Sequence, residues 1–165
     1  CVFTGTKGNY TETDPPDATD LYGQSKHQGE VADAHCVTLR TSVIGHELGI
    51  HLALLDWFLS QRVKTVSGFT KAIYSGFTTL EMARIVDRIL TQHTDLSGVW
   101  HVASQPISKF GLLQLCREKL GWEGVIEPND EFVCDRSLNA DRFNQATGYT
   151  PPSWEAMISE LAQQS

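Results

Sequence analysis

Tyr22 and Lys26 are the two side chains of this sequence whose types and spacing most clearly predict chemistry. Residues four apart lie on one face of a helix, one turn from each other. A phenol ordinarily loses its proton at about pH 10, and a neighbouring ammonium group favours the charged phenolate. The pair therefore predicts a proton donor for a carbonyl group that is being reduced. The alternative for this spacing is a helix that carries an exposed lysine.

The segments around this pair alternate between helix and strand patterns, which predicts an α/β fold. A helix is expected at about residues 22–34, and the apolar, β-branched run at 36–44 is typical of a buried parallel strand. Residues 63–74 and 99–103 are also β-prone. Further helices are expected at about 51–62 and after the capping residues Thr78, Ser108, Asn139 and Ser153.

Several short blocks along the chain occur in an order that resembles a known family. The first of these blocks is the opening segment 1–12. The others are Tyr22-Gly23-Gln24-Ser25-Lys26, Arg40-Thr41-Ser42, Gly68-Phe69-Thr70, residues 74–81, residues 98–102 and residues 147–152. Together they resemble the dTDP-4-dehydrorhamnose reductase (RmlD-like) branch of the extended short-chain dehydrogenase/reductases. The resemblance covers essentially the whole chain.

The resemblance implies a sugar-nucleotide reductase that uses NADH or NADPH. It implies that Lys26 binds the nicotinamide ribose and assists Tyr22, and that Tyr22 protonates the C4 oxygen of a 4-keto-6-deoxy sugar. It also implies that the nucleotide-sugar substrate lies against a further group of residues: Phe3, Thr4, Ser42, Val43, Phe69, Ser75 and Thr79.

Members of this family begin with a glycine-rich turn that holds the cofactor pyrophosphate, and no G-x-G-x-x-G spacing occurs here. The catalytic Ser or Thr of the family aligns just upstream of Cys1. We therefore expect the C-terminal half of a reductase, with a partial dinucleotide-binding (Rossmann) sheet and a small α+β substrate-binding lobe. Residues 1–45 are expected to be the sheet remnant, and residues 46–165 mainly the lobe, with one further sheet strand near 99–103. The chain alone is expected to bind no NAD(P)H.

Two other functions remain open at this point. The chain is alternatively a non-catalytic module that binds a sugar nucleotide or regulates a partner, as in members of the family that have lost catalysis, or a folded remnant without function. The strand at 36–44 is expected to have an unpaired edge in the absence of its sheet neighbours. We therefore expect a homo-oligomer, or pairing with the missing N-terminal half.

Composition excludes some partners. Of the 165 residues, 41% are hydrophobic and 20% charged, which is ordinary for a globular protein. The net charge of −7 argues against a nucleic-acid partner, and no apolar run approaches the roughly 20 residues of a membrane span. Four widely spaced cysteines predict reduced, buried thiols in a cytoplasmic protein.

Two charged patterns invite further interpretation. The segment from His46 to His51 approximates the zinc motif H-E-x-x-H, but its second histidine is one residue late, so we expect no metal. Arg40 lies inside an apolar strand, where an unpaired charge is costly. It either forms a structural ion pair, with Glu30 or Asp33, or faces the cleft.

Overall fold

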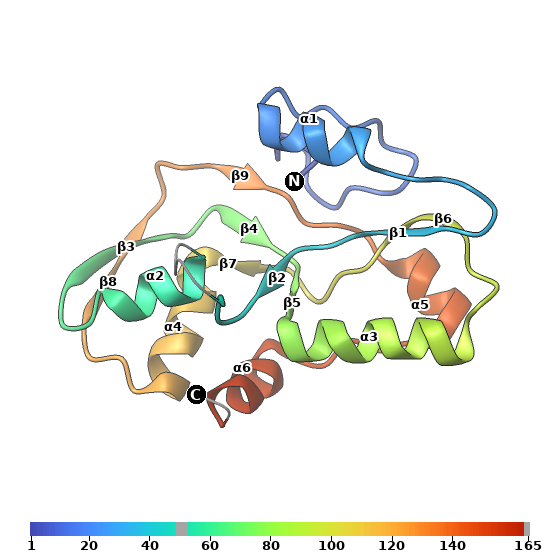
Figure 1. The fold of residues 1–165 in the computed structure, drawn as a ribbon. Helices are drawn as coiled ribbons and strands as arrows, with labels where there is room; N and C mark the ends of the chain where they lie inside the picture. The colour runs from blue at the N-terminus through green and yellow to red at the C-terminus, as the bar shows by residue number, and fades with distance from the viewer. Residues whose placement is uncertain (49–52, 164–165) are drawn as a thin grey trace.

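The computed structural model describes residues 1–48 and 53–163, which form a mixed α/β structure with short, mostly parallel sheets (Figure 1). The helices of this part of the chain are α1 (Leu21–Gln28), α2 (Leu54–Ser60), α3 (Thr79–Gln92), α4 (Lys109–Leu120), α5 (Asp141–Thr147) and α6 (Trp154–Ala162). The strands are β1 (Val37–Arg40), β2 (Val43–Ile44), β3 (Thr65–Phe69), β4 (Ala72–Tyr74), β5 (Phe77–Thr78), β6 (Gly98–His101), β7 (Ile107–Ser108), β8 (Val125–Asn129) and β9 (Cys134–Asp135).

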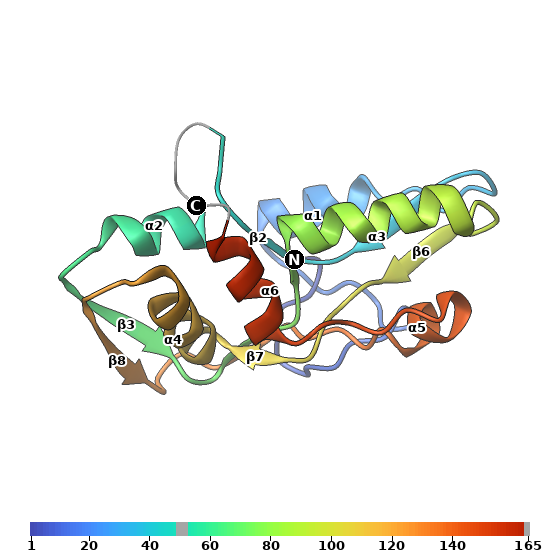
Figure 2. The same ribbon diagram turned by 90° about the horizontal axis from the view of Figure 1, so that it is seen from below.

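The strands pair in four small sheets. β1 runs parallel to β6, β2 to β5 and β3 to β8, and β4 lies between β7 and β9. Figures 1 and 2 place β3, β8 and α4 at one end of the molecule and β6, α3 and α5 at the other. Helix α1 lies at the periphery, above the start of the chain (Figure 1).

The expectation of one strand over 36–44 is wrong, because this segment forms two strands with different partners. β1 ends at Arg40, and β2 pairs with β5 instead of β6. At the change of partner, the Phe77 N–H donates a hydrogen bond to the Ser42 carbonyl at 2.9 Å, and this bond holds the segment before β2 against β5.

Helix α1 is also shorter than the expected 22–34. The side chain of Asp20 accepts a hydrogen bond from the Gly23 N–H at its start, and Gly29 ends it at the C-cap. Only Gly23 is buried, so α1 has no apolar stripe whose packing would favour a longer helix. Glu30, just after the cap, turns instead to pair with Arg40.

Three of the remaining helices start at predicted capping residues, whereas α2 and α5 follow Ala53 and Ala140 with no side-chain cap, so the expectation of Asn139 as the cap of α5 is wrong. Thr78, Ser108 and Ser153 each accept a hydrogen bond from the backbone N–H three residues on, as the sequence predicts. Helix α4 ends at Gly121 and α5 at Gly148, both with positive φ. In α3, Ile85 and Ile89 are buried, whereas Val86 and Leu90 are exposed.

Two hydrophobic clusters form the core. The larger joins α2, α3, α4 and α6 to the sheets, and three of the four tryptophans, Trp100, Trp122 and Trp154, are buried within it. The smaller cluster holds the start of the chain in place and contains Val2, Phe3, Tyr10, Ala103, Leu138 and Ala140. The expectation of four buried thiols is wrong for Cys36, which is exposed, and Cys1 is half-buried, while Cys116 and Cys134 are buried and all four are free.

A membrane span and a metal site can be looked for only in the part of the chain that the structure describes. Within it, no helix has the length and hydropathy needed to cross a membrane. The described residues also contain no group of three or more His, Cys, Asp or Glu side chains able to hold a metal ion. His51 of the zinc-like pattern lies outside these residues.

Candidate active site

A cavity of about 330 Å³ lies between α1, β1 and the start of the chain. Four residues predicted from the sequence line it together, namely Tyr22, Lys26, Phe3 and Ser42. Helix α1 approaches the chain start closely because Gly23 has no side chain. A Cβ at that position would lie 2.6 Å from the Cys1 carbonyl oxygen and 2.4 Å from the Ala18 Cβ.

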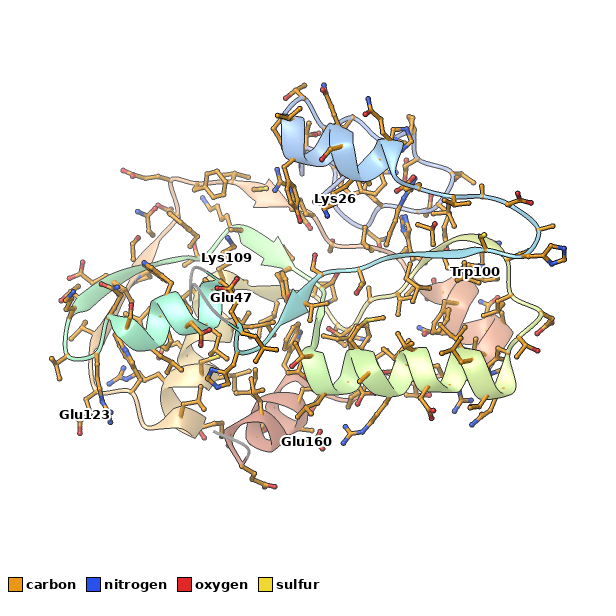
Figure 3. The ribbon with its side chains drawn as sticks, viewed as in Figure 1. Lys26, Glu47, Trp100, Lys109, Glu123 and Glu160 are labelled. Carbon is orange, nitrogen blue, oxygen red and sulfur yellow. The ribbon has the colours of Figure 1, made fainter. Side chains whose placement is uncertain are left out.

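The Tyr22 and Lys26 side chains lie together on α1, as the four-residue spacing predicts. The Lys26 Nζ is 5.3 Å from the centroid of the Tyr22 ring, within range of a cation–π interaction. Figure 3 shows Lys26 on the side of α1 that faces β1. Within residues 1–48 and 53–163, no carboxylate lies within ion-pair distance of Lys26, so its ammonium group can receive a ligand. Tyr22 is 63% exposed.

An ion pair forms part of the wall of this cavity. Arg40 donates from Nε and Nη2 to the two carboxylate oxygens of Glu30, at 2.7 and 2.8 Å. Both side chains are about nine-tenths buried, and both residues line the cavity. Although burial opposes it, hydrogen bonds from Arg40 and His27 lower the pKa of Glu30 below its ordinary value. The prediction that Arg40 forms an ion pair with Glu30 or Asp33 is therefore confirmed with Glu30, and Arg40 also faces the cleft.

A second cavity, of about 300 Å³, adjoins the first at Cys1 and Ser42, which line both. Its apolar lining includes Val43, Ile44 and Ile73, and two cationic residues, Lys109 and Arg136, also line it. Phe132 belongs to the same lining and is 48% exposed. Its ring packs against Phe69, with the centroids 5.2 Å apart. The two adjoining cavities are together called the cleft, with Tyr22 in the lining of the first and the two cationic residues in the lining of the second.

The other residues predicted from the sequence lie outside the linings of these two cavities. The Thr4 hydroxyl donates to Asp17 at 2.6 Å, and the buried Ser75 hydroxyl accepts from the Leu138 N–H at 3.0 Å. Phe69 touches the second cavity only through Phe132. Thr79 is the exposed first residue of α3.

Several cavity residues were not predicted from the sequence. They are Glu30, Thr38 and Leu138 in the first cavity and Lys109, Phe132 and Arg136 in the second. The one local signal that was available is Phe132 itself, an aromatic residue that directly follows the polar run at residues 129–131. Lys109 and Arg136 come from distant segments and follow no shared motif.

Comparison with known protein families finds a match over the whole chain. The sequence model of the RmlD substrate binding domain matches residues 1–165. No curated protein sequence gives a significant match. A hypothetical dTDP-4-dehydrorhamnose reductase from Sulfolobus tokodaii is 27% identical, with a TM-score of 0.75 over 94% of this chain and 59% of that one.

Two more distant structures share the fold. The dTDP-4-dehydrorhamnose reductase of Bacillus anthracis, solved in complex with NADP, is 20% identical, with a TM-score of 0.79 over 99% of this chain and 62% of that one. The dTDP-glucose 4,6-dehydratase of the same organism, solved in complex with NAD, is 13% identical, with a TM-score of 0.70 over 98% and 58%. The chain thus spans about three fifths of the length of these structures and matches part of a Rossmann-like reductase fold.

Proposed function

We propose that this chain, which belongs to the RmlD substrate binding domain family, binds the nucleotide sugar of a sugar-nucleotide reductase and supplies its proton donor. The observation that carries the proposal is the cleft, which joins the Tyr22–Lys26 pair to a cavity with two cations. A nucleoside diphosphate sugar has a matching order of groups, with the sugar at one end and the diphosphate and base at the other.

The chemistry assigned to the first cavity is the protonation of a sugar carbonyl. As the C4 carbonyl of a 4-keto-6-deoxy sugar is reduced, the O–H bond of Tyr22 breaks and a new O–H bond forms on the C4 oxygen. The phenolate left on Tyr22 is stabilised by the ammonium group of Lys26, on the next turn of the same helix.

The reductant assigned to this reaction is NADH or NADPH, which supplies the hydride when bound. The residues present fit its nicotinamide ribose, because the Lys26 ammonium has no carboxylate partner among the described residues and lies beside Tyr22. The sequence contains no glycine-rich turn for a pyrophosphate. We therefore expect no measurable NAD(P)H affinity in this polypeptide on its own.

The second cavity is assigned to the nucleotide. Lys109 and Arg136 supply the positive charge that a diphosphate needs. The exposed ring of Phe132 offers a face on which a nucleobase can stack. Ser42, which lines both cavities, and Val43, which lines the second, are assigned to the sugar, with Phe3 and Thr4 behind it. We propose that Phe69, Ser75 and Thr79 affect substrate binding indirectly, because they lie outside the linings of both cavities.

We also propose a division of the chain near residue 45. Residues 1–45 carry Tyr22 and Lys26, while residues 46–165 carry Lys109, Phe132 and Arg136. The four free cysteines favour a cytoplasmic protein, because a reducing compartment keeps thiols free.

We expect the double variant Lys109→Gln and Arg136→Gln to weaken binding of a dTDP-sugar about tenfold or more, since charge-assisted hydrogen bonds are typically worth about 1.5–3 kcal/mol each. Isothermal titration calorimetry of the chain measures this, with NADPH titrated separately. The matched control is Lys64→Gln, which removes a positive charge from a residue outside both cavities. Equal affinity in the double variant would place the diphosphate elsewhere, and tight binding of NADPH alone would contradict the assignment of this chain to the sugar nucleotide.

We further propose that β1 pairs with another strand, from a second copy of the chain or from an N-terminal half. The Gly98 N–H donates to the Cys36 carbonyl and the Val102 N–H to the Arg40 carbonyl, so Val37 and Leu39 direct their backbone groups to the opposite edge. No described strand pairs with that edge. The outer edge of β6, in contrast, is covered by side chains, because the His101 N–H donates to Glu12 and the Val99 carbonyl accepts from Arg142.

Light scattering over a wide range of concentration is therefore expected to show self-association of the isolated chain, which a Leu39→Pro change abolishes by blocking the edge. The same change on the covered edge, Val99→Pro, serves as the comparison for damage to folding. A wild-type chain that stays monomeric while its β1 amides are protected from exchange would contradict this proposal.

A further inference from the structure

Helix α1 makes few contacts with the rest of the chain, although it carries both proposed catalytic side chains. Of its residues only Gly23 is buried. Gly23 fixes the first turn against the Cys1 carbonyl and Ala18. The other end is held by Glu30, just beyond the Gly29 cap, through its paired hydrogen bonds from Arg40. The position of Lys26, one turn before Glu30, therefore depends on where Arg40 is held.

Arg40 is itself held by a buried histidine. The Arg40 Nη1 lies 3.2 Å from the Nε2 of His101, a residue with no exposed surface. The Nδ1 of the same ring lies 2.9 Å from the Tyr10 carbonyl oxygen. A carbonyl oxygen can only accept and a guanidinium can only donate, so Nδ1 carries the proton and Nε2 accepts. The contacts thus define a neutral imidazole with a single tautomer.

We propose that His101 is a positioning residue, which as a neutral imidazole accepts a hydrogen bond from Arg40, holds that guanidinium against Glu30, and so fixes the end of α1 that carries Lys26. The inference rests on the proposed function only for the role given to Tyr22 and Lys26. The chain of contacts from Tyr10 through His101 and Arg40 to Glu30 belongs to the structure of the chain alone.

The charges around His101 support a neutral ring. Burial lowers the pKa of His101 below its ordinary value, Glu12 and the Tyr10 carbonyl oppose this change, Arg40 adds to it, and Glu30 opposes it. Arg142 lies 3.9 Å from Glu12 and weakens the influence of that carboxylate. The aromatic ring of Phe3 also packs against His101 at a steep angle, with the ring centroids 5.8 Å apart. Protonation would direct an N–H of His101 at the cationic Arg40.

This arrangement has a defined pH dependence. The folded-state pKa of His101 lies below its unfolded value, so the unfolded chain takes up the proton first as the pH falls. The stabilisation is complete above the ordinary histidine pKa of about 6.5 and decreases as the pH falls from there through the folded-state pKa. We expect protection of α1 amides to decrease over the same range.

Two variants of His101 separate the proposed role from a general packing role. In His101→Gln the side-chain oxygen takes the place of Nε2 and can still accept from Arg40. In His101→Asn the side-chain nitrogen takes the place of Nδ1 and donates to Tyr10, but nothing accepts from Arg40. Hydrogen exchange of the α1 amides is expected to stay near wild type in the glutamine variant and to accelerate about tenfold in the asparagine variant, as the loss of one net hydrogen bond predicts.

The proposal is overturned if α1 exchanges equally fast in both folded variants, or if it is unchanged in the asparagine variant. If neither variant folds, the ¹⁵N chemical shifts of wild-type His101 decide, because the proposal requires a neutral ring protonated on Nδ1 at pH 7. A ring protonated on Nε2, or on both nitrogens, contradicts it.

Kinetics separate this inference from the proposed function. In a reductase that contains this chain, the asparagine variant is expected to lower kcat with little change in KM, and the glutamine variant to restore it. Failure of Tyr22→Phe to affect kcat would remove the proposed function and leave the exchange results standing. Failure of the exchange results alone would remove only the positioning role.

Discussion

The Tyr22→Phe change is expected to lower kcat roughly 10²–10⁴-fold, the range typical of a lost general acid, with little change in KM. The phenol acts on charge that develops on the C4 oxygen in the transition state, so its loss affects the chemical step more than substrate binding. Steady-state kinetics of a reductase in which a cofactor-binding half precedes Cys1 measure the effect. Because Tyr22 is 63% exposed, removal of its hydroxyl has little effect on folding.

The control for this measurement is Tyr149→Phe. The Tyr149 hydroxyl donates a hydrogen bond to Glu81 at 2.7 Å. Tyr149 lines neither of the two cavities. It is expected to lower stability while kcat stays near wild type. A Tyr22→Phe enzyme with near-normal kcat would give the Tyr22–Lys26 pair a structural role and favour a non-catalytic binding module.

The Phe3→Ala change is expected to destabilise the chain by about 3–5 kcal/mol, the usual cost of removing a fully buried phenylalanine. Phe3 has no exposed surface, stacks on Tyr10 with ring centroids 4.1 Å apart, and lies under the Arg40 guanidinium at 5.4 Å. In a chain of this size the change lowers Tm by roughly 10 °C. Thermal unfolding followed by circular dichroism measures it.

Phe132→Ala provides the comparison, because that ring is 48% exposed at the second cavity. It is expected to change Tm little and to weaken nucleotide binding. If Phe3→Ala instead left Tm unchanged and reduced binding, Phe3 would be a direct substrate contact, as the family resemblance implies, and not a core residue.

The helices whose starts were predicted correctly depend on local interactions. Ser108 and Ser153 cap α4 and α6 through hydrogen bonds that span three residues, and the glycines at 121 and 148 end their helices through backbone conformation. Such signals are contained in a few adjacent residues. The Tyr22–Lys26 pair was predictable for the same reason, since one helical turn places the two side chains together.

The features that were missed depend on contacts between distant segments. The sequence offered Glu30 as a partner of Arg40, just beyond the Gly29 cap of α1, but it did not predict that Arg40 is held by His101, a further 61 residues along. The break between β1 and β2 depends on β5, and the second cavity on Lys109, Phe132 and Arg136. No local pattern specifies these contacts, because each needs the tertiary structure to bring its partners together.

A crystal structure of the chain with a bound dTDP-sugar tests most directly whether this cleft joins substrate binding to proton donation. The diphosphate is expected to lie between Lys109 and Arg136, and the C4 oxygen of the sugar within hydrogen-bond distance of the Tyr22 hydroxyl, about 2.6–3.2 Å. A nucleotide sugar bound in another cavity, or with its sugar directed away from Tyr22, would contradict the claim that this cleft joins substrate binding to proton donation.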